Sequence, residues 1–238
     1  MNFKISFSIS LLLLTLLHVE SYPLVKRVVQ PGVRYERCVN SGMVALTFDD
    51  GPATVLTEEL LGILKTAGVS ATFFVVGTMV EQNPEIVLKA LNEGHHIASH
   101  TYTHANLDTL LGPAIESEVD LAATAIENAI GKKPQYIRCP YGACDAAALA
   151  VLGKKNLKVI HWNLDTKDWE NKSTEKTVDT YRETLSVANA NTDSFIALQH
   201  DIHETTIKAT ASIIDNIRRY GFKPVNMGEC LGDSELYF

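Results

Sequence analysis

Apolar runs of strand length alternate with longer amphipathic segments along most of the sequence, and this alternation constrains the fold more than any other feature. It continues from residue 43 to residue 226 without a change in composition, an internal repeat or a low-complexity tract. Consecutive parallel strands need a crossover between them, and that crossover is usually a helix. We therefore predict a single α/β domain, a distorted (β/α) barrel of about seven parallel strands, with an open doubly wound sheet as the alternative. The expected strands are 43–46, 71–76, 95–99, 135–138, 158–162, 194–198 and 223–226, and the expected helices are 54–67, 84–93, 113–130, 145–155, 174–188 and 205–220.

The N-terminal segment has a different pattern from the rest of the chain. Lys4 precedes a run from residue 5 to residue 17 that is apolar apart from serine and threonine. That run has the length of a secretory signal and is too short to cross a bilayer comfortably. Lys26 and Arg27 then form a dibasic pair of the kind that kexin-type processing proteases cleave. We expect a secreted, extracellular protein with a signal peptide at 1–21, a short propeptide at 22–27 and a mature domain at 28–238.

The chain is acidic, with 21 basic and 28 acidic residues and a formal net charge of −7. Removal of residues 1–27 would make it more acidic still, because that segment carries three basic residues and only one acidic residue. An acidic surface repels phosphate backbones and anionic lipids, so we expect neither nucleic acid nor a membrane as a partner of the mature form. Such a surface tolerates a neutral substrate and a product that becomes cationic. We expect the mature chain to be a monomer.

Four cysteines in a secreted chain suggest two disulfide bonds, for which three pairings are possible. Cys38 lies just before the first expected strand and Cys230 just after the last. A bond between them would tie together the two ends of a closed fold, and we predict that pairing. Cys139 and Cys144 would then either close a short loop or remain as two buried thiols.

Polar and titratable residues follow the expected strands at the points where those strands end. In (β/α) barrels the chemistry gathers at the carboxyl ends of the strands, so these residues are the candidates for a common site. Scattered surface polarity rarely marks five separate strand ends. The residues concerned are Asp49 and Asp50, His100 and His104, the segment 138–142, the segment 165–169 and the segment 198–201.

Two of these strand ends carry the residue types that bind a divalent metal. Asp49 and Asp50 are adjacent, and neighbouring side chains at a strand end point in different directions, so one can bind a metal while the other takes a proton. His100 and His104 are four residues apart, and we expect them on one face of a helical turn, where two imidazoles chelate an ion. No glutamate follows the first histidine, so this is not the zinc-protease helix, which needs that residue as its base.

Two further histidines precede the pair, at the start of an expected strand. We expect His95 to be a structural strand residue and His96 to be exposed to solvent.

The strand-end segments resemble, in the same order along the chain, the polysaccharide deacetylases of carbohydrate esterase family four, and in particular the chitin deacetylase group. The resemblance covers roughly residues 40–230 and so implies that 28–238 is a polysaccharide deacetylase catalytic domain. Any one of these segments alone would be weak evidence, but five in order make a specific pattern. The matching segments are 47–52, 94–107, 138–142, 165–169 and 198–201.

The resemblance implies a metal centre and a base. Asp50, His100 and His104 resemble the metal ligands, with Zn²⁺ as the expected ion and Co²⁺ or another divalent ion as a substitute. Asp49 resembles the general base that takes a proton from the attacking water. Arg138 resembles the partner that aligns Asp49 and keeps it ionised by holding its pKa low.

The resemblance also implies an acid and a binding pocket. His200 resembles the general acid that protonates the leaving amine, and Asp168 the carboxylate that orients His200 and raises its pKa. The backbone N–H of Tyr141 resembles half of an oxyanion hole. Trp169 and Leu198 resemble the walls of the pocket for the acetyl methyl group.

The chain departs from the family pattern at Cys139, where proline or alanine is frequent. This departure puts the rigidity of the 138–142 loop in doubt, and also its insensitivity to oxidation and reduction. It removes no catalytic group. A separate motif, Asn171-Lys172-Ser173, fits an acceptor site for N-linked glycosylation at Asn171.

The resemblance implies a secreted, metal-dependent N-deacetylase that hydrolyses N-acetylated polysaccharide, namely chitin or chitooligosaccharides, and releases acetate. A signal peptide followed by a dibasic site indicates a eukaryotic secretory route, which favours chitin. The alternatives within the family are a peptidoglycan N-acetylglucosamine deacetylase and an acetylxylan esterase. A non-haem iron oxygenase also binds its metal with two histidines and a carboxylate, but that reaction would leave His200 and the Arg138–Asp49 pair without a function. An inactive polysaccharide-binding protein on the same fold would have lost a ligand or the base, and none is lost here.

Overall fold

All pairs of strands within residues 29–238, the part of the chain that the computed structural model describes, are parallel. The signal peptide and propeptide expected at 1–27 lie outside these residues. The strands form two sheets, one of six strands and one of four. In order across the first sheet they are β1 (Arg34–Tyr35), β7 (Lys158–Ile160), β6 (Tyr136–Ile137), β5 (His96–Ser99), β4 (Thr72–Val75) and β3 (Thr47–Asp49). The second sheet has the order β10 (Lys223–Val225), β2 (Met43–Ala45), β9 (Phe195–Leu198) and β8 (Leu164–Asp165).

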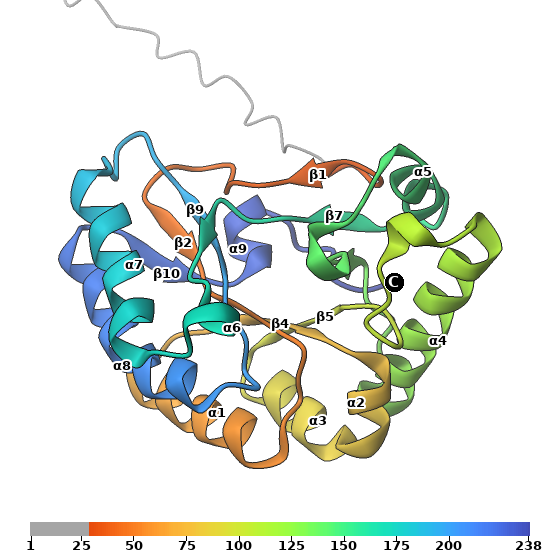
Figure 1. Ribbon diagram of the computed structural model, residues 1–238, viewed down its shortest axis with the longest axis horizontal. Helices are drawn as coiled ribbons and strands as arrows, with labels where there is room; N and C mark the ends of the chain where they lie inside the picture. Colours follow the sequence, from red (N-terminus) through yellow and green to blue (C-terminus); the bar gives the residue numbers. More distant parts are fainter. Residues whose placement is uncertain (1–28) are drawn as a thin grey trace, which may run out of the picture.

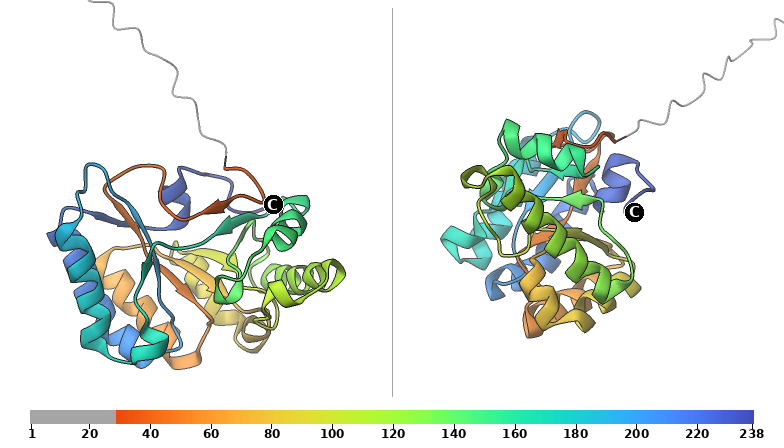
Figure 2. Two further views of the ribbon diagram at one scale, coloured as in Figure 1. Left: turned by 45° about the horizontal axis from the view of Figure 1, so that its top comes forward. Right: turned by 90° about the vertical axis from the view of Figure 1, so that its right-hand side faces the viewer.

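One continuous stretch of chain joins the two sheets, because β2 and β3 are interrupted only at Leu46. The Leu46 N–H donates to the carbonyl of Val225 at 3.0 Å, and the Leu46 carbonyl accepts from the N–H of Thr72 at 2.9 Å. On the other side, the connector 161–163 runs between the sheets with hydrogen bonds to both β1 and β9. The strands and this connector therefore close a distorted barrel, as predicted, and Figure 2 shows the strands fanning out inside the outer helices.

The long helices form an outer layer around the strands, on the left, lower and right sides of Figure 1. All six expected helices are present, and α2, α6 and α9 are short additions. The helix α1 ends as predicted at Gly68, which takes the left-handed conformation with φ 63°. Within residues 29–238 no helix combines the length and the apolar character needed to cross a bilayer. The helices are α1 (Thr54–Ala67), α2 (Gly77–Gln82), α3 (Pro84–Asn92), α4 (Gly112–Ile130), α5 (Ala146–Lys154), α6 (Asp168–Asn171), α7 (Thr174–Val187), α8 (Glu204–Arg219) and α9 (Met227–Leu231), with 3₁₀ turns η1 (Leu107–Thr109) and η2 (Pro140–Gly142).

The main core lies between the strands and helices α1 and α8. Phe48 and Phe73 from adjacent strands stack there with ring centroids 5.5 Å apart, and Leu60 and Ile213 from the two helices are fully buried beside them. Each such side chain contributes about 1.5–3 kcal/mol by leaving water. Because the strands pack against these helices, the carboxyl ends of the strands are held at fixed positions.

The two histidines at the start of β5 are both buried. His95 has a structural role, as predicted, because its Nδ1 accepts a hydrogen bond from the N–H of Ala71 at 3.0 Å, but it lies just before β5 and not in the strand. The prediction that His96 is exposed is wrong, since only 1% of it is accessible. Its ring packs edge-on against Tyr136 and Tyr237, so it fills space under the sheet.

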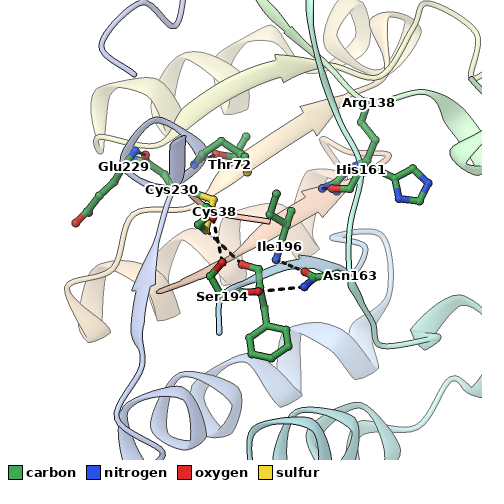
Figure 3. The surroundings of a disulfide bond; sticks show 12 residues. Cys38, Thr72, Arg138, His161, Asn163, Ser194, Ile196, Glu229 and Cys230 are labelled. Atoms are coloured by element: carbon green, nitrogen blue, oxygen red, sulfur yellow. Dashed lines mark hydrogen bonds between the residues drawn. A yellow bond between two sulfur atoms is a disulfide. The ribbon is translucent and has the colours of Figure 1, made fainter. Parts of the chain in front are cut away.

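The predicted Cys38–Cys230 disulfide is present, with the two Cα atoms 4.6 Å apart. It joins the segment before β2 to α9, which follows the last strand, and Figure 3 shows it beside the start of β9. There the hydroxyl of Ser194 donates a hydrogen bond to the carbonyl of Cys38 at 3.1 Å. Cys139 and Cys144 are also bonded to each other, which decides the alternative that the sequence left open.

Candidate active site

The carboxyl ends of the strands surround a cavity of about 490 Å³. A cavity of about 610 Å³ between α1 and α8 is larger, but no histidine or cysteine is among the described residues that line it. Arg138 and Asp168 lie buried behind the wall of the smaller cavity, and they contact residues that line it. The lining residues are Asp49, Asp50, His100, His104, Cys139, Tyr141, Trp162, Asp165, Trp169, Leu198 and His200.

Asp50, His100 and His104 converge on one point of this cavity. Each offers a ligand atom, and these atoms all lie within 4.8 Å of one another. Asp50 Oδ1 is 3.5 Å from Nε2 of His100 and 3.3 Å from Nε2 of His104. The predicted helical turn is wrong, however, because residues 100–104 form a loop in which Thr101 and His104 have positive φ angles. Two left-handed residues, rather than helical spacing, bring the two imidazoles together.

The chemistry of these three residues fits a divalent cation. The buried Oδ1 of Asp50 accepts no hydrogen bond, although two ring nitrogens face it. His100 Nδ1 lies 2.8 Å from the carbonyl of Arg138, which can only accept, so the proton belongs on Nδ1 and the lone pair of Nε2 points at Asp50. Burial lowers the pKa of His100 to about 3, which keeps the ring neutral, as a metal ligand must be. Two imidazoles and one carboxylate suit zinc and neighbouring transition metals.

Asp49 has one carboxylate oxygen, Oδ1, bound by a buried arginine, while its Oδ2 lies 3.8 Å from Nε2 of His100. Arg138 donates from Nη1 to Asp49 Oδ1 and to the hydroxyl of Thr47, both at 2.7 Å, and its guanidinium lies over the ring of Phe74. Asp49 is only 1% exposed, and this burial raises its pKa although Arg138 opposes the shift. The expectation that the pKa of Asp49 is low is therefore wrong, although Arg138 lowers it as expected. Arg138 limits the rise that burial causes.

His200 and Asp168 form a second buried pair on the opposite wall. Asp168 Oδ1 accepts from His200 Nδ1 at 2.7 Å, while its Oδ2 accepts from the backbone N–H of His200 and from the hydroxyl of Thr206. Burial lowers the pKa of His200, but the hydrogen bond and negative charge of Asp168 outweigh it and raise the pKa to about 9. His200 is therefore protonated at neutral pH, with Nε2 4.0 Å from Asp50 Oδ2.

Aromatic side chains form the open rim of the cavity. Tyr141 in η2 is 70% exposed and Trp169 in α6 is 49% exposed, while Leu198 is buried at the end of β9. Trp162 and Asp165 also line the cavity, and our reading of the sequence assigned them no role. Asp165 begins the candidate segment 165–169 and Trp162 lies two residues beyond β7, and these positions at strand ends were the available signal.

Asn171 is the last residue of α6, close to this rim, and is partly exposed. Its Oδ1 accepts from the N–H of Ser173, and its Nδ2 donates to the carbonyl of Thr166. Glycosylation at Asn171 remains a prediction.

Comparisons with known proteins give one consistent result. A family model described as polysaccharide deacetylase matches residues 36–160. The chain is 39% identical to a chitin deacetylase of Colletotrichum lindemuthianum, over 89% of this chain and 88% of that protein. It is also 39% identical to a probable peptidoglycan-N-acetylglucosamine deacetylase of Arthroderma benhamiae, of which it spans 45%.

Solved structures agree with the sequence relatives. The chitin deacetylase structure from Colletotrichum lindemuthianum superposes with a TM-score of 0.85 at 36% identity, over 88% of this chain and 97% of that one. The Bc1960 peptidoglycan N-acetylglucosamine deacetylase superposes with a TM-score of 0.79 at 28% identity, over 87% and 95% of the two chains.

Proposed function

The chain belongs to the polysaccharide deacetylase family, and from that premise we propose that it is a secreted, metal-dependent N-deacetylase of chitin or chitooligosaccharides. The observation that carries this proposal is the completeness of the site. Three potential metal ligands, an arginine-bound carboxylate and a carboxylate-bound histidine all face one cavity. The products would be acetate and a glucosamine unit of a chitosan-type chain.

Asp50, His100 and His104 are the residues that would hold the ion, which we propose to be zinc. When bound, a divalent ion supplies Lewis-acid chemistry, because it polarises the acetyl carbonyl and lowers the pKa of a water molecule toward about 7. Asp50 contributes the negative charge, and the two neutral imidazoles complete the donor set.

Asp49 would accept the proton of the attacking water through Oδ2. Arg138 occupies Oδ1, so it fixes the orientation of the carboxylate and leaves Oδ2 on the side of His100, 3.8 Å from its Nε2. Burial raises the pKa of Asp49, which makes it a stronger base than an exposed aspartate and so favours this task.

His200 would donate the second proton. Attack of water on the acetyl carbon forms a new C–O bond, and the C–N bond can break only when the amide nitrogen receives a proton, because an amide anion is a poor leaving group. Protonated His200 supplies that proton from Nε2, while Asp168 accepts from Nδ1 and stabilises the imidazolium. The backbone N–H of Tyr141 is proposed to stabilise the carbonyl oxygen, and Trp169 and Leu198 to enclose the acetyl methyl group.

Charge favours chitin over peptidoglycan. Chitin is neutral, whereas peptidoglycan carries carboxylates that an acidic protein of net charge −7 repels. Peptidoglycan N-acetylglucosamine deacetylation and acetylxylan de-esterification remain the competing proposals, since relatives of the first type match this chain. An inactive binding protein is disfavoured because every ligand, base and acid position is occupied by a competent residue.

We also propose that the mature protein is extracellular and monomeric, beginning at residue 28 after removal of the segments at 1–21 and 22–27. Two disulfides suit an oxidising compartment. N-glycosylation at Asn171 would follow from the same secretory route.

The test is acetate release from chitin oligomers, peptidoglycan and acetylxylan by the mature protein, each before and after removal of metal with a chelator. We expect release from chitin oligomers to be greatest, to be lost with the metal and to return with zinc or cobalt. Full activity of the metal-free protein would contradict the metal assignment, and greater release from peptidoglycan or acetylxylan would contradict the substrate.

A further inference from the structure

The two candidate histidine ligands are held in different ways. His100 is buried, and its Nδ1 contacts the backbone carbonyl of Arg138, which no side-chain change can remove. His104 is partly exposed, and its Nδ1 lies 3.1 Å from the hydroxyl of Tyr141. The rings of His104 and Tyr141 also meet edge to face, with centroids 4.7 Å apart. The side chain of Tyr141 is therefore the group that can set the orientation of His104.

The direction of this hydrogen bond follows from the position of the ligand set. His104 Nε2 faces Asp50 Oδ1 at 3.3 Å, so a bound ion would need the Nε2 lone pair. In a neutral imidazole the proton then sits on Nδ1, and the Tyr141 oxygen accepts it. Groups that accept from the second nitrogen of a ligating histidine fix its tautomer and ring orientation.

Tyr141 is itself held by the loop that carries it. It lies between Cys139 and Cys144, which are joined by a disulfide, and its backbone takes the left-handed conformation with φ 61°. Gly142 follows with φ 68°, and a Cβ there would approach the Trp162 ring to 2.9 Å. The disulfide therefore links the segments on both sides of Tyr141, and the backbone at Gly142 packs closely against Trp162.

We propose that the Tyr141 hydroxyl is the positioning group for His104 in the metal centre, and that the Cys139–Cys144 disulfide holds Tyr141 in place for this task. The inference rests on the proposed metal-dependent function, and it gives the Tyr141 side chain a role separate from that of its backbone N–H. It also gives a purpose to Cys139, which departs from the family pattern.

The experiment measures zinc binding to the metal-free mature protein by calorimetry, for the wild type and for Tyr141→Phe, which removes only the hydroxyl. We expect the variant to bind zinc about 10–100-fold more weakly, the usual effect of losing such a partner. The visible absorption of the cobalt-loaded variant should also change, because the His104 ring is free to tilt. Tyr220→Phe is the matched control, because it removes a hydroxyl at the C-terminal end of α8, outside the cavity, and it should bind zinc as the wild type does.

A second variant, Cys139→Ala/Cys144→Ala, tests the disulfide. It should weaken zinc binding in the same direction, and adding Tyr141→Phe to it should cost less than in the wild-type background, because both changes disturb one contact. Zinc binding by Tyr141→Phe within threefold of the wild type would overturn the inference, whether or not the cysteine variant folds. Absence of zinc binding by the wild type would instead overturn the proposed metal site itself, and the inference with it.

Discussion

At the scale of single residues, the site depends on a division of labour between two adjacent carboxylates. Asp49 ends β3 in extended conformation and turns toward Arg138, whereas Asp50 takes φ 81° and turns toward His100 and His104. Aspartate tolerates this left-handed conformation better than most residues. One change of backbone direction thus separates the proposed base from the proposed ligand.

His200→Ala should slow hydrolysis of chitin oligomers by roughly 10²–10⁴, the usual contribution of a positioned acid. Hydrolysis of an aryl acetate should slow far less, because a phenolate leaves without a proton. Steady-state rates on the two substrates measure this difference. Equal losses on both would show that His200 is not the acid for the leaving group.

The pH profile of kcat/KM should have limbs set by Asp49 and His200. The acid is active only when protonated, so kcat/KM should fall as pH rises through the His200 pKa of about 9. The base is active only when ionised, so kcat/KM should also fall as pH drops through the raised pKa of Asp49.

Asp168→Asn removes the charge that raises the His200 pKa, and the alkaline limb of its kcat/KM profile should move to lower pH. An alkaline limb that stays in place would refute the proposed coupling, and Asp193→Asn, at a remote loop, is the control.

The residues that line the cavity could be placed near one another from the sequence, because strand ends are visible as breaks in apolar runs. The loop that unites His100 and His104 could not be predicted, since the positive φ angles of Thr101 and His104 leave no periodic signal. The direction of the Asp49 pKa shift could not be predicted either, because the balance between burial and Arg138 depends on packing.

At the scale of elements, α8 shows why the long helices were predictable. Its buried residues recur at helical spacing, and they pack in the core with buried residues of α1 and α7. The short helices α2, α6 and α9 are too brief for such a period to emerge. Asn83 directly precedes α3, but its side chain makes no capping hydrogen bond to that helix. It accepts instead from the hydroxyl of Thr54 and donates to the carbonyls of Pro52 and of Met79 in α2.

Ile213→Ala in α8 should destabilise the protein by about 2–5 kcal/mol, because it opens a cavity at a fully buried position. Val187→Ala is the control, since Val187 is 87% exposed at the end of α7 and its change should cost less than about 0.5 kcal/mol. Urea unfolding measures both. Equal effects would contradict the assignment of this helix face to the core.

At the scale of the whole molecule, the closed fold depends on a disulfide that could be predicted from the sequence and on a connector that could not. The Cys38–Cys230 pair could be predicted because the two residues flank the first and last expected strands. The connector 161–163 could not, because it bridges the two sheets without being a strand itself. Its hydrogen-bond partners lie in two different sheets, so they are set by tertiary structure and leave no local pattern.

Cys38→Ala/Cys230→Ala should lower the free energy of unfolding by roughly 5 kcal/mol in the chain-entropy model, because the bond spans 192 residues. Cys139→Ala/Cys144→Ala is the matched control, with a separation of 5 residues and an expected loss of roughly 2 kcal/mol in the same model. Equilibrium unfolding in denaturant gives both values. A smaller loss for the long-range bond than for the short one would contradict this account of how the ends are tied.

The most direct test of the central claim compares Asp49→Asn with the wild type, both as mature proteins loaded with zinc. Bound zinc and acetate released from a chitin oligomer are measured on the same samples. We predict equal zinc content, because Asp50, His100 and His104 remain, together with loss of most acetate release, because the base is gone. Acetate release by zinc-loaded Asp49→Asn at the wild-type rate would contradict the proposed mechanism.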